Sequence, residues 1–91
     1  MKNWNKNFAI NIARKKKIIL NDKHWDIIYF IRDFYYKYKI SPSINILIIF
    51  FNKKNINNKI SLNYLNLIFK NKFDKNIYKI SGIPYPNKCL L

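Results

Sequence analysis

The chain has 91 residues, 49% of them hydrophobic, which is enough for one folded domain with a single core and too few for two. Its one glycine excludes glycine-rich phosphate loops, and its one cysteine excludes an internal disulfide. The longest apolar run, residues 44–51, is interrupted by Asn45 and is too short to cross a bilayer. No secretory signal pattern opens the sequence, so we expect a cytoplasmic protein with no membrane partner.

The charge is strongly positive. Eighteen Lys and Arg stand against four Asp, which gives a formal net charge of +14. Such an excess commonly indicates a nucleic-acid or anionic-surface partner. However, Lys, Asn and Ile are all abundant here and all have A/T-rich codons, so genome composition explains the charge equally well. Composition alone leaves nucleic-acid binding open.

The apolar periodicity predicts five short helices. Asn3 is expected to cap the first, which ends at the basic run 14–17. Its apolar residues recur every four positions: Trp4, Phe8 and Ile12. Asn21 is expected to cap the second, with Asp22 in the first turn, where the helix dipole favours an acid. The apolar face of this second helix is so wide that we expect it to be buried on most sides.

The three later helices are predicted from their start and stop signals. Ser41 followed by Pro42 reads as an N-cap with a first-turn proline, opening a third helix through the Ile-rich run. Ser61 is expected to cap a fourth helix. A fifth, over residues 73–80, should end at Gly82, the one residue that enters the left-handed region without steric cost.

We therefore predict an all-α fold: about five short helices in an orthogonal bundle, with a helical domain over residues 1–82 and an extended C-terminal arm over residues 83–91. The second and third helices resemble a helix-turn-helix. Base-specific DNA reading is disfavoured, because the third helix offers only Asn45 as a side chain suited to base edges.

The chain offers few groups for catalysis. One His, four scattered Asp and no Glu exclude paired catalytic carboxylates, hydrolytic triads and metal clusters, so we expect no cofactor and no metal. His24 lies in the first turn of the second helix, where a structural role is favoured over a catalytic one. The spacing between His24 and the single cysteine, Cys89, does not support a Cys-His nucleophile pair.

Cys89 lies third from the end of the sequence, in IPYPNKCLL. Pro84 and Pro86 favour an extended backbone, so the thiol should be accessible. The adjoining Lys88 favours the thiolate, which is the form that attacks sulfur. Gly82 can act as a hinge, and the prolines can extend the arm into another protein's active site. An incidental cysteine at the end of a chain explains these observations equally well.

Two segments of the chain match sequence motifs of a known family, and they occur in the same order as in that family. Residues 20–44, LNDKHWDIIYFIRDFYYKYKISPSI, contain His-Trp, then Arg-Asp-Phe-Tyr and Ser-Pro. Residues 79–89, KISGIPYPNKC, are similar to a Lys-Ile-Ala-Gly-Leu-Pro-Lys-Pro tail that ends in Cys. The chain thereby resembles the DsrC/TusE family of sulfur carriers, and more specifically its TusE branch, from about Trp4 to Cys89.

The resemblance implies a sulfurtransferase that carries sulfur as a persulfide on Cys89. It implies a TusBCD-like complex as the sulfur donor and an MnmA-like tRNA 2-thiouridylase as the acceptor, which modifies the wobble uridine of tRNA. DsrC proteins have a second cysteine eleven positions earlier, where this chain has Tyr78. A simple single-cysteine relay is therefore expected, without a disulfide switch.

The departures from the family pattern are also specific. The N-terminal β meander of the family is expected to be absent. Asn45 replaces an Arg, and the stretch YLNLIFKNK, residues 64–72, lacks the Arg, Pro and Gly of the family's Tyr-Leu-Tyr-Arg-Leu-Phe-Pro-x-Gly pattern. Leu91 places the thiol one residue deeper than usual, and we have no physical account of it.

Two alternatives to a sulfur carrier stay open. One is a basic helical nucleic-acid-binding module in which Cys89 is incidental, and the other is an interaction protein whose partners bind residues 44–51. A direct contact between a sulfur carrier and tRNA is compatible with the charge as well.

Overall fold

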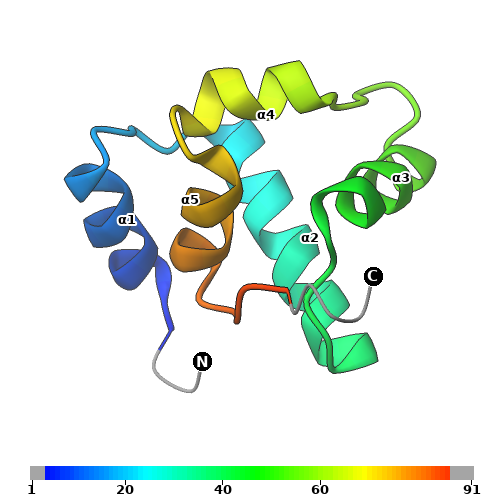
Figure 1. Cartoon of the computed structure of the whole chain (residues 1–91), viewed down its shortest axis with the longest axis horizontal. Coiled ribbons are helices and arrows are strands. Elements are labelled where there is room, and N and C mark those ends of the chain that lie inside the picture. Colours follow the sequence, from blue (N-terminus) through cyan, green and yellow to red (C-terminus); the bar gives the residue numbers. More distant parts are fainter. Residues whose placement is uncertain (1–3, 87–91) are drawn as a thin grey trace.

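The computed structural model describes residues 4–86, which form five helices and contain no strand. The helices are α1 (Lys6–Lys15), α2 (Asp22–Tyr38), α3 (Ile44–Lys54), α4 (Leu62–Phe69) and α5 (Phe73–Ser81). In Figure 1, α2 runs down the middle, α4 crosses the top, and α1 and α3 lie on opposite sides. The predicted all-α fold, with a helix-turn-helix-like pair formed by α2 and α3, is confirmed. None of these helices is both long and apolar enough to span a membrane.

Polar caps decide where most of the helices begin. Asn21 accepts hydrogen bonds from the backbone N–H groups of Lys23 and His24, and Ser61 accepts one from the N–H of Tyr64. These bonds satisfy N–H groups that the first turn of a helix leaves without a partner. The predicted caps at Asn21 and Ser61 are thus confirmed, as is the end of α5 at Gly82.

Two predicted helix starts are wrong by two residues each. The cap of α1 is Asn5 rather than Asn3, because the Asn5 side chain accepts a hydrogen bond from the N–H of Phe8. Trp4 consequently precedes the helix instead of lying on its apolar face. The cap of α3 is Ser43 rather than Ser41, whose hydroxyl bonds elsewhere.

The core is filled by residues from all five helices. Its large members are Ile27, Ile28 and Ile31 of α2, Leu47 and Phe51 of α3, Leu65 and Phe69 of α4, and Ile77 and Ile80 of α5. Helix α1 contributes the small residues Ala9 and Ala13, four positions apart on one face, which let it pack closely against α5. Helix α5 therefore packs between α1 and α2, and the segment that follows it leaves from the centre of the bundle (Figure 1).

Candidate functional site: the base of the C-terminal arm

The structure describes part of the predicted site. Gly82, Pro84 and Pro86 lie within the described residues, whereas Lys88 and Cys89 lie outside them. What the geometry defines is the base of the arm, residues 82–86, together with the side chains that hold it.

The arm begins where a backbone motif ends α5. Gly82 has φ +70°, its N–H donates to the carbonyl of Lys79, and the N–H of Ile83 donates to the carbonyl of Tyr78. This is the Schellman arrangement, which satisfies the last carbonyls of a helix. A side chain at Gly82 would also collide with the Cδ1 atom of Trp4. Glycine is thus required here both for its backbone conformation and for the close approach of an indole ring.

Arg32 and Trp4 hold the end of α5 in place. The guanidinium of Arg32 donates to the carbonyl of Ser81 at 2.9 Å and to the hydroxyl of Tyr36 at 3.1 Å. The Trp4 ring centroid lies 4.0 Å from the Arg32 guanidinium carbon, and its indole N–H donates to the carbonyl of Ile80 at 2.9 Å. A cation at a helix C-terminus is favoured by the helix dipole, and its stacking on an aromatic ring adds to this.

The first residues of the arm pack against the helices. Ile83 is 7% exposed, and the carbonyl of Pro84 accepts a hydrogen bond from the hydroxyl of Ser41 in the α2–α3 turn. The Tyr85 ring meets Tyr78 edge to face at 5.2 Å, and its hydroxyl donates to the carboxylate of Asp74 at 2.9 Å. That hydrogen bond raises the pKa of Tyr85 above its ordinary value. The arm therefore starts along a defined path between α5 and the α2–α3 turn.

Tyr78 occupies the position at which the DsrC pattern has its second cysteine. It is 2% exposed, and its hydroxyl donates to the carbonyl of Pro42 at 2.6 Å. Burial raises its pKa well above the ordinary value for tyrosine, so it stays neutral and keeps this hydrogen bond. Instead of a thiol facing the arm, the chain has a buried ring against which Tyr85 packs.

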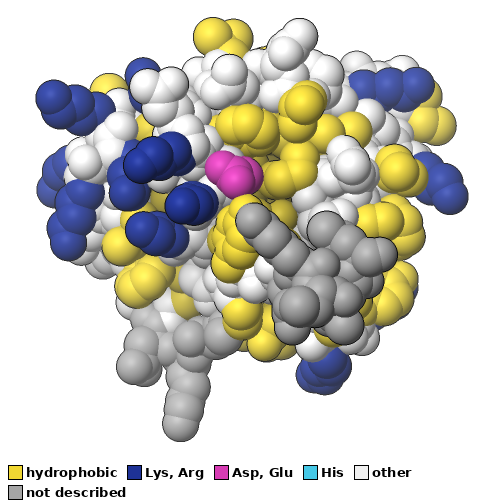
Figure 2. All heavy atoms as spheres, viewed as in Figure 1, with side chains coloured by type: hydrophobic (Ala, Val, Ile, Leu, Met, Phe, Trp, Pro, Cys, Tyr) yellow, Lys and Arg dark blue, Asp and Glu magenta, His cyan; other side chains and the backbone are white. Residues whose placement is uncertain are grey.

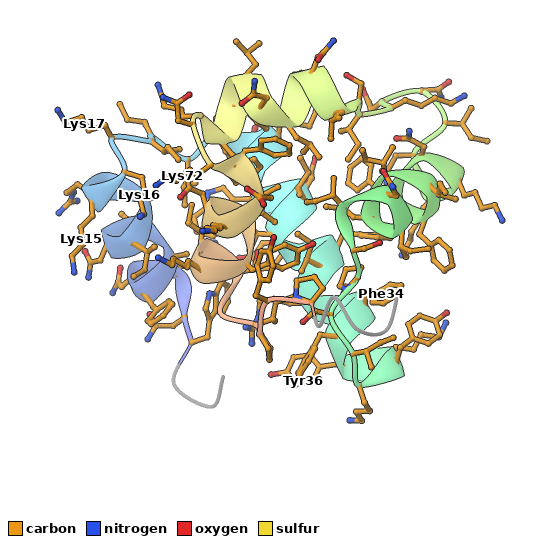
Figure 3. The ribbon with its side chains drawn as sticks, viewed as in Figure 1. Lys15, Lys16, Lys17, Phe34, Tyr36 and Lys72 are labelled. Atoms are coloured by element: carbon orange, nitrogen blue, oxygen red, sulfur yellow. The ribbon has the colours of Figure 1, made fainter. Side chains whose placement is uncertain are left out.

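A groove lies next to the arm base. It has a volume of about 340 Å³ and is lined by the end of α2, the α2–α3 turn, the start of α3 and residues 84–86. Figure 3 shows Phe34, which lines it, and Tyr36, which holds Arg32, near the lower end of α2. Ile40 and Ile46 also line the groove and are 54% and 37% exposed, so its wall is largely apolar. Such a surface suits contact with another protein.

His24 has a structural role, as predicted. Its Nδ1 atom accepts from the N–H of Asn21 at 3.0 Å, and its Nε2 atom donates to the carbonyl of Ile68 at 2.8 Å, so one neutral tautomer satisfies both bonds. Burial lowers the pKa of His24; the bond to Ile68 opposes this shift, and the charge of Lys70 adds to it. His24 lies near the start of α2, about 20 Å along the helix from the α2–α3 turn.

Sequence reasoning missed Arg32 and Trp4 as site residues. The hydrogen bonds that define them join positions 49 and 76 residues apart, and no local pattern reveals such pairs. One signal was present: Arg32 is one of only two arginines, and it interrupts an otherwise apolar stripe of α2, four positions from Ile28 and Tyr36.

Known proteins resemble this chain over nearly its whole length. The family model described as "DsrC like protein" matches residues 1–90. The Sulfurtransferase TusE of Buchnera aphidicola subsp. Schizaphis graminum is 42% identical over 92 residues, covering 96% of this chain and 76% of the relative. The Sulfurtransferase TusE homolog of Haemophilus influenzae is 40% identical, covering 96% and 80%.

A solved structure agrees with the fold as well. The NMR structure of Allochromatium vinosum DsrC superposes with a TM-score of 0.87 at 30% sequence identity, covering 98% of this chain and 80% of that one. Together with the arm that follows Gly82 and the tail motif that contains Cys89, these similarities show that the chain belongs to the DsrC/TusE family of sulfur carriers, in its TusE-like branch.

Proposed function

We propose that Cys89 carries sulfane sulfur in a relay for tRNA 2-thiolation. The donor is a TusBCD-like complex, and the acceptor is an MnmA-like thiouridylase that holds tRNA and modifies its wobble uridine. The observation that supports this most is the match to the family over residues 1–90, which includes the tail motif of this single-cysteine chain. The reducing environment that such thiol chemistry needs suits the cytoplasm.

The proposed transfer needs no oxidant. The Cys89 thiolate attacks the outer sulfur of a donor persulfide, a new S–S bond forms on Cys89, and the donor leaves as a thiolate. The second step repeats this exchange with a thiolate of the acceptor enzyme. Lys88 supports both steps, because an adjacent cation favours the thiolate form.

The arm base sets where the sulfur can go. We treat residues 1–82 as the helical body and residues 83–91 as the arm, of which residues 83–86 pack against the body in the structure. Cys89 follows Pro86 by three residues, so its reach is about 10 Å from that point. In this arrangement Gly82, Pro84 and Pro86 set a fixed direction for the tail instead of acting as a hinge. A partner must therefore dock beside the groove to receive sulfur.

A mass measurement tests the sulfur carrier directly. Incubating the protein with a persulfide donor should add one sulfur atom to the wild type and none to Cys89→Ser. Lys88→Ala is the matched control, since it keeps the thiol and should load more slowly to the same end point. A wild type that takes up no sulfur would refute the proposal.

Reconstitution in cells tests the tRNA step. In bacteria that lack their own carrier, the wild-type chain should restore 2-thiouridine in tRNA, and Cys89→Ser should not. If Cys89→Ser restores thiolation fully, the thiol is incidental, as the alternative of a basic nucleic-acid-binding module requires.

A further inference from the structure

One edge of the molecule gathers cations from two separate segments. Its members, which we call the basic edge, are Arg14, Lys15, Lys16 and Lys17 at the end of α1 and Lys70 and Lys72 in the α4–α5 turn. Figure 3 shows Lys15, Lys16, Lys17 and Lys72 on the α1 side of the molecule. In Figure 2, dark blue side chains cluster on this side, with magenta only at the inner border of the cluster.

The turn that presents two of these lysines is fixed by a buried side chain. Asn76 is 3% exposed, and its amide donates to the carbonyls of Phe69 and Asn71 at 2.8 and 3.0 Å. Both bonds hold the turn in one conformation. The positions of Lys70 and Lys72 are therefore set by the fold.

A groove lies beside the basic edge. It has a volume of about 450 Å³, and its lining combines the cations Arg14 and Lys17 with an apolar wall that includes Ile18 and Trp25. The Trp25 ring is partly exposed and stacks on Tyr29 with centroids 5.8 Å apart. The ammonium group of Lys6 also lies over the Trp25 ring, 5.7 Å from its centroid. Cations beside a partly exposed aromatic ring are an arrangement that binds phosphates and an unstacked base together.

We infer that the basic edge and this groove bind a single-stranded loop of RNA. The lysines contact its phosphates, and one splayed base packs against Trp25. A fully paired duplex offers no such base. The helix α3, which would read DNA in a helix-turn-helix, exposes the apolar residues Ile46, Ile49 and Phe50 along its middle. This site goes beyond the sulfur transfer proposed above and does not involve Cys89.

Fluorescence anisotropy with a labelled RNA hairpin that has an unpaired loop tests the inference. The edge variant replaces Lys15, Lys16, Lys17 and Lys72 with Gln. Its matched control replaces Lys37, Lys53, Lys54 and Lys59, exposed lysines outside the basic edge, and so loses the same charge. We expect the edge variant to bind about tenfold or more weakly, with a salt slope shallower by about 3, and the control to bind nearly as the wild type does. Equal weakening of both variants would show diffuse attraction and overturn the site.

The base contact has its own readout. RNA should quench the fluorescence of the wild type, and most of this quenching should be lost in Trp25→Phe, which keeps an aromatic ring in the groove wall. Unchanged quenching in Trp25→Phe, or equal affinity for a fully paired RNA duplex of the same length, would contradict binding of an unstacked base.

Sulfur loading of the same variants separates this inference from the proposed function. The edge variant should still gain one sulfur atom on Cys89 when given a persulfide donor. Loss of RNA binding with intact loading supports two separate sites. A wild type that binds the hairpin at the basic edge but takes up no sulfur would remove the relay and leave the RNA site standing.

Discussion

Gly82 is the residue on which the geometry of the arm base most depends. Gly82→Ala should destabilise the fold by at least about 1–2 kcal/mol, because it forces a side chain into the left-handed region. The added methyl also displaces Trp4 from the end of α5. Urea denaturation measures the loss of stability.

The neighbouring Ser81→Ala is a matched control. Its hydroxyl is buried and has no hydrogen-bond partner among the described residues, so its removal should leave stability unchanged or raise it slightly. If Ser81→Ala and Gly82→Ala lose the same amount of stability, the loss in Gly82→Ala is not due to the backbone conformation of that residue.

His24 makes stability depend on pH. Its pKa is lowered in the folded chain, while the unfolded chain titrates near the ordinary value of about 6.5. As the pH falls, the unfolded state therefore binds more protons than the folded state does. The free energy of unfolding should decrease from about pH 7 to pH 5. Denaturation midpoints measured across this range test the slope.

His24→Gln supplies the comparison. This variant should be less stable than the wild type at pH 7, and its free energy of unfolding should change little between about pH 7 and pH 5, because it has no imidazole to protonate. A variant with the wild-type slope would assign the pH dependence to other groups.

At the element scale, the α4–α5 turn holds a lysine where the family pattern has glycine. Lys72 precedes α5 with φ 61° and makes no side-chain capping bond. Lys72→Gly should therefore raise the free energy of unfolding by roughly 0.5–1 kcal/mol, while Lys72→Ala, which keeps the backbone strain, should give no gain. Thermal unfolding distinguishes the two. A gain in Lys72→Ala that equals the gain in Lys72→Gly would show that removed charge, rather than relieved strain, is responsible.

Helix positions were predictable where the signals are local. The caps at Asn21 and Ser61 and the glycine stop of α5 were correct because each is decided within a few residues. The start of α3 was predicted wrongly, because the hydroxyl of Ser41 bonds to the carbonyl of Pro84, 43 positions away, and so does not cap the helix. The same reason hid Arg32 and Trp4, so the sequence indicated the tail that carries the thiol but not the side chains that position its base.

At the scale of the whole molecule, the net charge of +14 should oppose the compact state. Raising sodium chloride from about 0.02 M to about 0.2 M shortens the screening length severalfold and should raise the melting temperature. The edge variant and its control, which have both lost charge, should show smaller increases than the wild type. An unchanged melting temperature in the wild type would mean that the repulsion is already relieved at low salt.

The fixed arm base also has a consequence for selectivity. The helices hold Pro84 and Tyr85 in place, and Cys89 follows Pro86 by three residues, so the proposed transfer requires a partner that comes within about 10 Å of Pro86. A protein that docks beside the groove satisfies this requirement, whereas one that docks on the opposite side of the molecule does not. In the proposed relay, selectivity among the many thiols of a cell then depends on where a partner docks as well as on the reactivity of the cysteine.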